Sequence, residues 1–313
     1  MQGATQLDRL SDNESTKGVD NYRRVEITEK YIEVNDTKLC YFETGEQRQG
    51  SNTFLLVHAT GFHARCWDRT IEHLKNQHVI AVDMRGHGRS NNLGPFTWDT
   101  FGQDLTEFVG ALDLNSIVGV GHSMGGHSIC QAAAYELGRF SRLLLVDPVI
   151  LAPESYSQPV SRNAWMSDGK EHPVARRRNH FESVAAMIEN FKGRGSFAHW
   201  QYNVLQDYCE FGSLPNAKGL MLACPPEVEA AIYGGSAGTD ISALIEKIVI
   251  PVTILRARNR QDREGLMDFS GSPTWDELAL HFKDGRDVLL PQLTHFIPMQ
   301  DPELTAKFVL DTV

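Results

Sequence analysis

The chain has 313 residues, of which 41% are hydrophobic and 22% are charged. These proportions are typical of a globular protein and argue against a collagen-like, disordered or membrane-spanning class. Asp and Glu number 40 against 30 Lys and Arg, and the net charge of −10 would on average repel a polyphosphate backbone. We therefore expect an enzyme or a binding protein without a nucleic-acid partner.

The first 22 residues are polar and rich in Asp, Asn, Ser and Thr, so we expect a leader that packs little. It lacks the apolar segment of a signal peptide, and no apolar run in the chain approaches 18 residues, which predicts no membrane span. The five cysteines are scattered without a CxxC pair. This pattern favours reduced thiols and a cytoplasmic location over disulfides or a metal site.

Apolar patterns along the chain predict a largely parallel sheet. Residues 24–43 alternate as in strands around the turn-forming Asn35-Asp36, which indicates an antiparallel hairpin. Short, almost wholly apolar runs follow, and strands without alternation are buried on both faces. These runs cover residues 53–57, 79–82, 117–120, 143–146 and 248–255.

Segments long enough for crossover helices separate these runs. They cover residues 67–76, 100–112 and 124–137. This alternation predicts an α/β fold whose mostly parallel central sheet is flanked by helices. Residues 150–242 show no convincing buried strand, so we expect an inserted helical cap there. The α/β core then comprises residues 23–149 and 243–313.

A candidate nucleophile follows the run at 117–120. The segment Gly121-His122-Ser123-Met124-Gly125-Gly126 precedes a helix-compatible stretch. In a nucleophile elbow, a serine occupies a tight turn between a strand and a helix, and flanking glycines avoid clashes of the closing backbone. The alternative is a tight turn in which Ser123 has no chemical role. The strand before it and the helix after it favour the elbow.

A serine hydroxyl needs a base and an acid that orients it. We expect the base after the last strand, and His295 follows a predicted strand at residues 286–290. His281 falls inside a predicted helix at 274–282 and is a weaker candidate. An oxyanion hole is the third requirement, and we assign it to the backbone N–H groups of Met124 and Thr60.

Four motifs carry a resemblance to the α/β-hydrolase superfamily of the esterase and lipase type. They are residues 56–61 (LVHATG), 82–90 (VDMRGHGRS), 121–126 (GHSMGG) and 294–298 (THFIP). The resemblance implies an α/β-hydrolase fold with a Ser-acid-His triad and no cofactor. It spans residues from about 50 to 300. One departure is Ala59, which stands where the family usually has glycine and adds a methyl beside the oxyanion loop.

The acid of the triad has two candidates. The family usually carries it after the penultimate core strand, where this chain has Arg260 and, two residues later, Asp262. Some members take it from the end of the preceding strand, where Asp147 lies 24 residues after Ser123. We favour Asp147 and keep Asp262 and a triad without either as alternatives, because mutual geometry decides the matter.

The same resemblance suggests roles for other residues. Arg85 and His87 are expected to brace loops around the elbow. His122 either contacts substrate or makes a structural hydrogen bond, and the arginines at 176–178 either attract an acidic substrate or line a solvated helix face. Candidate pocket residues, mainly aromatic residues of the cap, are Phe62, Trp165, Trp200, Tyr202 and Phe296.

Serine at the elbow argues for acyl transfer, because dehalogenases and epoxide hydrolases on a similar scaffold need an aspartate nucleophile. The first hypothesis is a carboxylesterase for small to medium esters. The second is a hydrolase of a lactone or of a carbon-carbon bond on the same triad. The third is a non-catalytic binding protein, which is disfavoured because Ser123 and His295 are both present.

Overall fold

The structure is a computed structural model that describes most of the chain. The described residues are 26–157, 171–236, 239–259 and 268–311. The leader predicted over residues 1–22 lies outside them.

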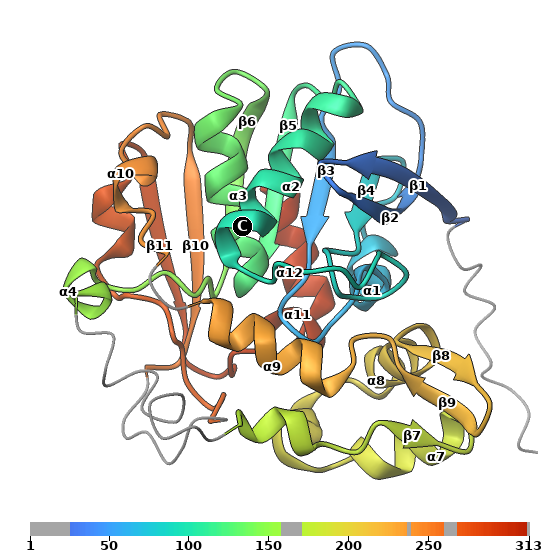
Figure 1. Cartoon of the computed structure of the whole chain (residues 1–313). Helices are drawn as coiled ribbons and strands as arrows, with labels where there is room; N and C mark the ends of the chain where they lie inside the picture. Colours follow the sequence, from blue (N-terminus) through green and yellow to red (C-terminus); the bar gives the residue numbers. More distant parts are fainter. Residues whose placement is uncertain (1–25, 158–170, 237–238, 260–267, 312–313) are drawn as a thin grey trace, which may run out of the picture.

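An eight-stranded sheet forms the centre of the molecule, in the spatial order β1-β2-β4-β3-β5-β6-β10-β11 (Figure 1). Only the β1–β2 and β2–β4 pairs are antiparallel, and the other neighbours run parallel. The predicted hairpin and mostly parallel sheet are therefore confirmed. The strands are β1 Thr28–Val34, β2 Thr37–Thr44, β3 Thr53–Val57, β4 His78–Val82, β5 Ile117–His122, β6 Phe140–Val146, β10 Val252–Ala257 and β11 Gly285–Leu290.

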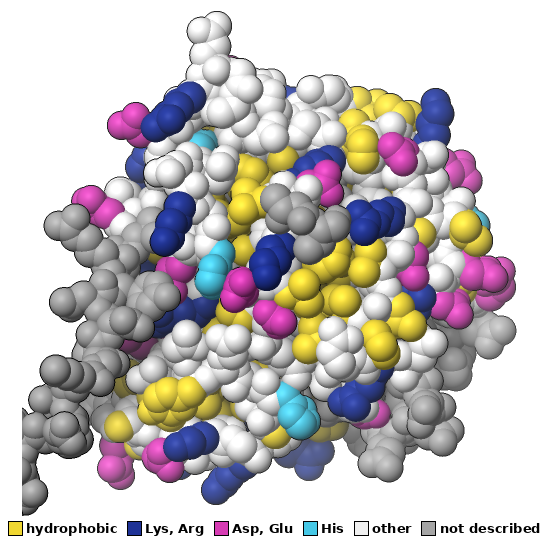
Figure 2. Space-filling model, turned by 180° about the vertical axis from the view of Figure 1, so that it is seen from behind, with side chains coloured by type: hydrophobic (Ala, Val, Ile, Leu, Met, Phe, Trp, Pro, Cys, Tyr) yellow, Lys and Arg dark blue, Asp and Glu magenta, His cyan; other side chains and the backbone are white. Residues whose placement is uncertain are grey.

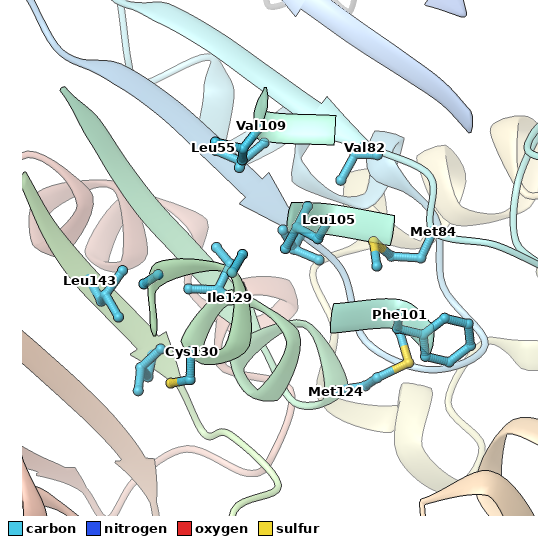
Figure 3. Close-up of a cluster of buried hydrophobic side chains, with 14 of the residues drawn as sticks. Leu55, Val82, Met84, Phe101, Leu105, Val109, Met124, Ile129, Cys130 and Leu143 are labelled. Atoms are coloured by element: carbon cyan, nitrogen blue, oxygen red, sulfur yellow. The ribbon is translucent and has the colours of Figure 1, made fainter. Parts of the chain in front are cut away.

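Helices cover both faces of the sheet. On one face, α2 (Trp98–Ala111) and α3 (Met124–Tyr135) pack together with α10 (Ser242–Ile245). On the other face, α1 (Asp68–Ile71) packs with α12 (Pro302–Val309). The larger core lies between the sheet and the α2–α3 pair (Figure 3). In it Met124, the first residue of α3, is fully buried, which fixes the start of that helix.

Three predicted boundaries were wrong. The strand expected at 248–255 begins only at Val252, because Pro251 has no N–H to donate to the ladder. The helix expected at 67–76 is one turn of α1 after a 3₁₀ turn at Ala64–Trp67, and Asn76 has a φ of +64°. The helix expected at 274–282 is only the 3₁₀ turn Leu278–His281. Before this turn, within the expected helix, the Trp275 N–H donates to the Ile150 carbonyl rather than to a helical neighbour.

The chain forms an inserted segment between β6 and α10, and its residues 171–235 lie below the carboxyl ends of the parallel strands in Figure 1. It contains helices and also a small antiparallel sheet in the order β7-β9-β8. The insertion was expected to be helical, and the three strands were not foreseen because they have only two to four residues and include Pro215. Its elements are α4 Pro153–Tyr156, η2 Pro173–Arg176, β7 His180–Phe181, α7 Val184–Phe191, η3 Gly195–His199, α8 Tyr202–Phe211, β8 Ser213–Asn216, β9 Gly219–Leu222 and α9 Pro226–Gly235.

Charges of both signs are mixed on the face that Figure 2 shows, where Lys and Arg side chains lie among Asp and Glu side chains. The net charge of −10 is therefore not gathered into a surface of one sign on this face. In the parts of the chain that the structure describes, every helix is too short or too polar to cross a bilayer.

A buried ion pair joins the loop after β4 to α2, and its loss should destabilise the fold. The Arg85 guanidinium donates to both carboxylate oxygens of Asp104 at 2.7 and 2.9 Å, and the two side chains are 1% and 0% exposed. Arg85→Met leaves the buried Asp104 carboxylate without its cation, although the Asn35 side chain still donates to it at 2.9 Å. We expect the free energy of unfolding in urea to fall by about 3–5 kcal/mol. Asp113→Asn, at the exposed partner of Arg139, is the control and should change little. Equal unfolding curves for Arg85→Met and wild type would contradict this expectation.

Candidate active site

Ser123 lies between β5 and α3 in a backbone conformation that few non-glycine residues adopt, with φ 58° and ψ −117°. Its N–H donates to the Val146 carbonyl on β6 at 3.0 Å. A Cβ on Gly121 would lie 2.4 Å from the Gly125 carbonyl oxygen, and one on Gly125 would lie 2.3 Å from the Val57 carbonyl oxygen. The glycines are thus required by close backbone packing, and that packing holds Ser123 in its strained turn.

The structure brings Ser123, His295 and Asp147 into one hydrogen-bonded chain. His295 Nε2 is 3.0 Å from Ser123 Oγ, and His295 Nδ1 is 2.7 Å from Asp147 Oδ2. All three residues are at least nine-tenths buried. Since Nδ1 donates to the carboxylate, Nε2 is free to accept the serine proton. The alternative acid, Asp262, lies outside the described residues.

The Asp147 carboxylate is held by donors from the other side. Its Oδ1 atom accepts from the Ala257 N–H at 3.0 Å, from the Ser272 hydroxyl and from the Thr274 hydroxyl at 3.3 Å. These contacts orient Oδ2 toward His295. Sequence reasoning missed Ser272 and Thr274, because no local motif marks hydroxyls that lie more than 120 residues away from their acceptor.

His295 is positioned by two further residues. The Phe269 ring stacks on its imidazole with centroids 5.8 Å apart and an interplanar angle of 18°, and the Phe269 carbonyl accepts from the His295 N–H. His122 Nε2 donates to the His295 carbonyl at 2.8 Å. Of the two roles expected for His122, the structural hydrogen bond is the one observed. Phe269 was missed, since it belongs to none of the motifs that the sequence analysis used.

The turn after β3 lies against the amino terminus of α3. Thr60 Oγ1 is 3.4 Å from Met124 Sδ, so the two residues expected to form the oxyanion hole are in contact. The next N–H, that of Gly61, donates to His87 Nε2 at 3.0 Å. The Ala59 carbonyl accepts from the Phe62 N–H at 3.1 Å and closes the turn, and Ala59 is itself buried.

His58, in the turn itself, and His87, in the loop after β4, brace this turn. His58 Nδ1 donates to the Ala59 carbonyl, and His58 Nε2 accepts from the Met84 N–H at 3.0 Å. His87 Nδ1 donates to the Arg85 carbonyl, which leaves its Nε2 to accept from Gly61. The segment from Asp83 to Ser90 thus supports the turn after β3, in keeping with the expectation that Arg85 and His87 brace loops around the elbow.

Three of the five expected pocket residues gather beside His295. Phe62 lies 5.4 Å from Trp200 and 5.8 Å from Phe296, and the Phe296 ring is 5.4 Å from His295. Tyr202 makes none of the ring contacts described for this group. It is 51% exposed at the start of α8, where the Lys192 ammonium lies over its ring. Trp165 lies outside the described residues.

The described residues contain no group of three or more His, Cys, Asp or Glu side chains placed to hold a metal ion. All five cysteines are buried and unpaired.

Fold and side-chain geometry together define an α/β protein with a serine, histidine and carboxylate at the carboxyl ends of its strands. The chain belongs to the alpha/beta hydrolase family, whose model matches residues 54–308. Lipases and esterases are among the proteins that the chain resembles in sequence.

Individual relatives differ in how much of their length is matched. Human monoacylglycerol lipase ABHD6 is 26% identical over 298 residues, which are 90% of this chain and 81% of that protein. Lipase LipV of Mycobacterium tuberculosis is 33% identical over 101 residues, 32% of this chain. The matches span only 39% of LipV and 28% of the sn-1-specific diacylglycerol lipase ABHD11 of Danio rerio.

Solved structures share the fold at low sequence identity. An E-2-(acetamidomethylene)succinate hydrolase superposes with a TM-score of 0.72 at 18% identity and covers 91% of this chain and 98% of its own. A thioesterase domain from the curacin biosynthetic pathway gives 0.67 at 18% identity, with 91% and 99% covered. At these identities the likeness shows the fold alone.

Buried histidines around the site should make the protein acid-sensitive. Burial is the main cause that lowers the pKa of His63 and His122 to about 3 and that of His87 to about 4, whereas unfolded histidine titrates near 6.5. As the pH falls from about 6.5 to 4, the unfolded chain binds more protons, and each histidine costs about 1.4 kcal/mol of stability per pH unit. Burial raises the pKa of Asp68 and Asp83 to about 6, and these two carboxyls act in the opposite direction.

We therefore expect a lower free energy of unfolding in urea at pH 5 than at pH 7. His87→Gln removes one of these histidines. The slope of the free energy of unfolding against pH should therefore fall by about the 1.4 kcal/mol per pH unit that one histidine contributes. A free energy of unfolding that stays constant or rises when the pH is lowered from 7 to 5 would contradict the assignment of these buried histidines as neutral.

Proposed function

We propose that this protein is a serine hydrolase that cleaves carboxylic esters of small to medium size through an acyl-enzyme. The observation that carries the proposal is the hydrogen-bonded chain from Ser123 Oγ through His295 to Asp147. Nucleophile, base and orienting acid are the three parts that serine acyl transfer needs. Family membership and the lipase and esterase relatives point to the same chemistry.

In the proposed cycle, His295 Nε2 takes the proton of Ser123 as Oγ attacks the ester carbonyl carbon. The negative charge on the carbonyl oxygen is stabilised by the backbone N–H groups of Thr60 and Met124, at the positive end of α3. Collapse of the tetrahedral intermediate breaks the bond to the alcohol, which leaves with the proton from His295. Water, activated by His295 in turn, then releases the acid and restores Ser123.

Asp147 holds the imidazole in the tautomer that this cycle needs and stabilises the imidazolium that forms. Its three donors keep the carboxylate fixed during both half-reactions. We assign the aromatic group of Phe62, Trp200 and Phe296 to the acyl or alcohol part of the substrate, because it adjoins His295. The segment of residues 150–242 is proposed to act as the cap over the site.

A cytoplasmic location is part of the proposal, since all five cysteines are buried free thiols. Lactones and carbon-carbon bonds next to a carbonyl could enter the same cycle. A panel of p-nitrophenyl esters of rising chain length, assayed beside lactones, separates these substrates. Absence of turnover with every ester would exclude the carboxylesterase.

The nucleophile can be tested by covalent labelling. A fluorophosphonate probe should label the wild-type protein at Ser123, and Ser123→Ala should abolish labelling and lower kcat for p-nitrophenyl acetate by about 10⁵-fold or more. Circular dichroism and thermal melting check that the variant folds. A wild-type protein that the probe fails to label would favour a non-catalytic binding protein instead.

The acid can be tested with a pair of variants. Asp147→Asn should lower kcat by about 10⁴-fold, because an amide no longer favours the tautomer with a proton on Nδ1 of His295. Asp262→Asn is the matched control and should keep most of the activity. The reverse outcome in steady-state kinetics would transfer the role of the acid to Asp262.

A further inference from the structure

The turn that carries the Thr60 N–H is covered by a carboxylate of the inserted segment. A Cβ on Gly61, which has a φ of +78°, would lie 2.5 Å from Oε1 and 2.7 Å from Cδ of Glu229. The Glu229 carboxylate on α9 therefore lies directly against the α-carbon of Gly61. From the core side, His87 Nε2 accepts from the Gly61 N–H at 3.0 Å. Gly61 is thus held between the core and the inserted segment.

Glu229 is 4% exposed and is paired with the Arg177 guanidinium. Arg177 Nη1 donates to Glu229 Oε2 at 2.6 Å, and Arg177 Nη2 donates to the Tyr208 hydroxyl at 3.0 Å. Burial raises the pKa of Glu229, and the Arg177 guanidinium opposes that rise. One guanidinium therefore joins the residue after η2 to both α9 and α8.

The arginines at 176–178 do not share one environment. Arg176 and Arg178 are exposed, as expected for a solvated surface, whereas Arg177 is only partly exposed and forms the Glu229 pair. Of the two alternatives, a solvated face therefore describes Arg176 and Arg178 but not Arg177. The three-residue run carries no periodic signal that would single out its middle member.

The same cluster contacts the residues that follow Gly61. The Tyr208 ring lies 5.6 Å from the ring of Phe62 and stacks on His63 at 5.8 Å with an angle of 24°. His63 Nε2 donates to the Tyr208 carbonyl at 3.2 Å. Residues 61, 62 and 63 are thus each contacted by Glu229 or Tyr208, the two side chains that Arg177 holds.

We propose that Arg177 and Glu229 are positioning residues that clamp Gly61 and so fix the Thr60 N–H where the oxyanion forms. The proposal rests on the function proposed above. A hydrogen-bond donor that stabilises developing charge must be in place before the reaction, and a displacement of about 1 Å can cost about 100-fold in rate. Because the donor acts mainly on the transition state, loss of the clamp should lower kcat and leave KM nearly unchanged.

The clamp can be tested by removing its charges. Arg177→Met and Glu229→Gln should each lower kcat for p-nitrophenyl esters by about 10- to 100-fold with KM within about threefold of wild type. Fluorophosphonate labelling of Ser123 should slow by a similar factor. The double variant should be no slower than the single ones, since the pair acts as a unit. It also removes both charges, so it can be measured even if a single variant with one unpaired charge does not fold.

Arg177→Lys is the conservative variant and should recover part of kcat, because a lysine still neutralises Glu229 but lacks the second planar donor. The matched control is Arg69→Met. Arg69 donates to Asp207 at 2.7 and 3.0 Å and ties the same helix α8 to α1. This variant should lower the melting temperature and keep kcat.

Equal losses of kcat in Arg69→Met and Arg177→Met would show that the pair is merely structural, and a change confined to KM would show that Arg177 binds substrate. Either result overturns the clamp. If the wild-type protein cleaves no ester and resists the fluorophosphonate, the proposed function fails and the clamp fails with it. An active wild type beside an unimpaired Arg177→Met overturns the clamp alone.

Discussion

The close approach of backbones at the nucleophile turn is the constraint on which the rest of the site depends. Gly125 lies where any Cβ would collide with the Val57 carbonyl of β3, and Gly121 is blocked in the same way by Gly125. This contact presses the start of α3 against the central strands and holds Ser123 at its positive φ. The strain is tolerated because one hydrogen bond, from the Ser123 N–H to the Val146 carbonyl, and the buried Met124 side chain fix the turn on both sides.

Parallel strands then bring the other groups to the same edge. Ser123 follows β5 and Asp147 follows β6, and these strands are neighbours in the sheet, so the two side chains emerge side by side. Thr60 follows β3 on the other side of β5. His295 comes from the loop after β11, two strands from β6, and it reaches Asp147 because Phe269 and His122 hold its backbone and ring. Ligands of open α/β sheets bind at this edge for the same topological reason.

Buried polar groups, rather than apolar contact alone, join the parts of the molecule. Asp104 with Arg85 fixes the loop after β4, and Glu229 with Arg177 covers the loop after β3. A buried pair adds little stability over an apolar contact, but its directionality sets one arrangement of the loops. The neutral rings of His58 and His87 fix the turn after β3 in the same way. Each of their ring nitrogens makes one hydrogen bond to a backbone group. The turn after β3 is therefore held by hydrogen bonds on the core side and by contact of the Glu229 carboxylate with Gly61 on the side of the inserted segment.

The sequence by itself determined the fold class, since unalternating apolar runs and intervening helical stretches are local patterns that a parallel sheet requires. It also singled out Ser123 and His295, because the glycines of the elbow and the position after the last strand are readable from the chain. Only the tertiary structure decided which carboxylate meets His295, that Phe269 and Ser272 support the pair, and that Arg177 reaches Glu229. The partners in these contacts lie between 26 and 148 positions apart, as the residue numbers show. Side chains that far apart are brought together by packing, which leaves no periodicity or local motif to read.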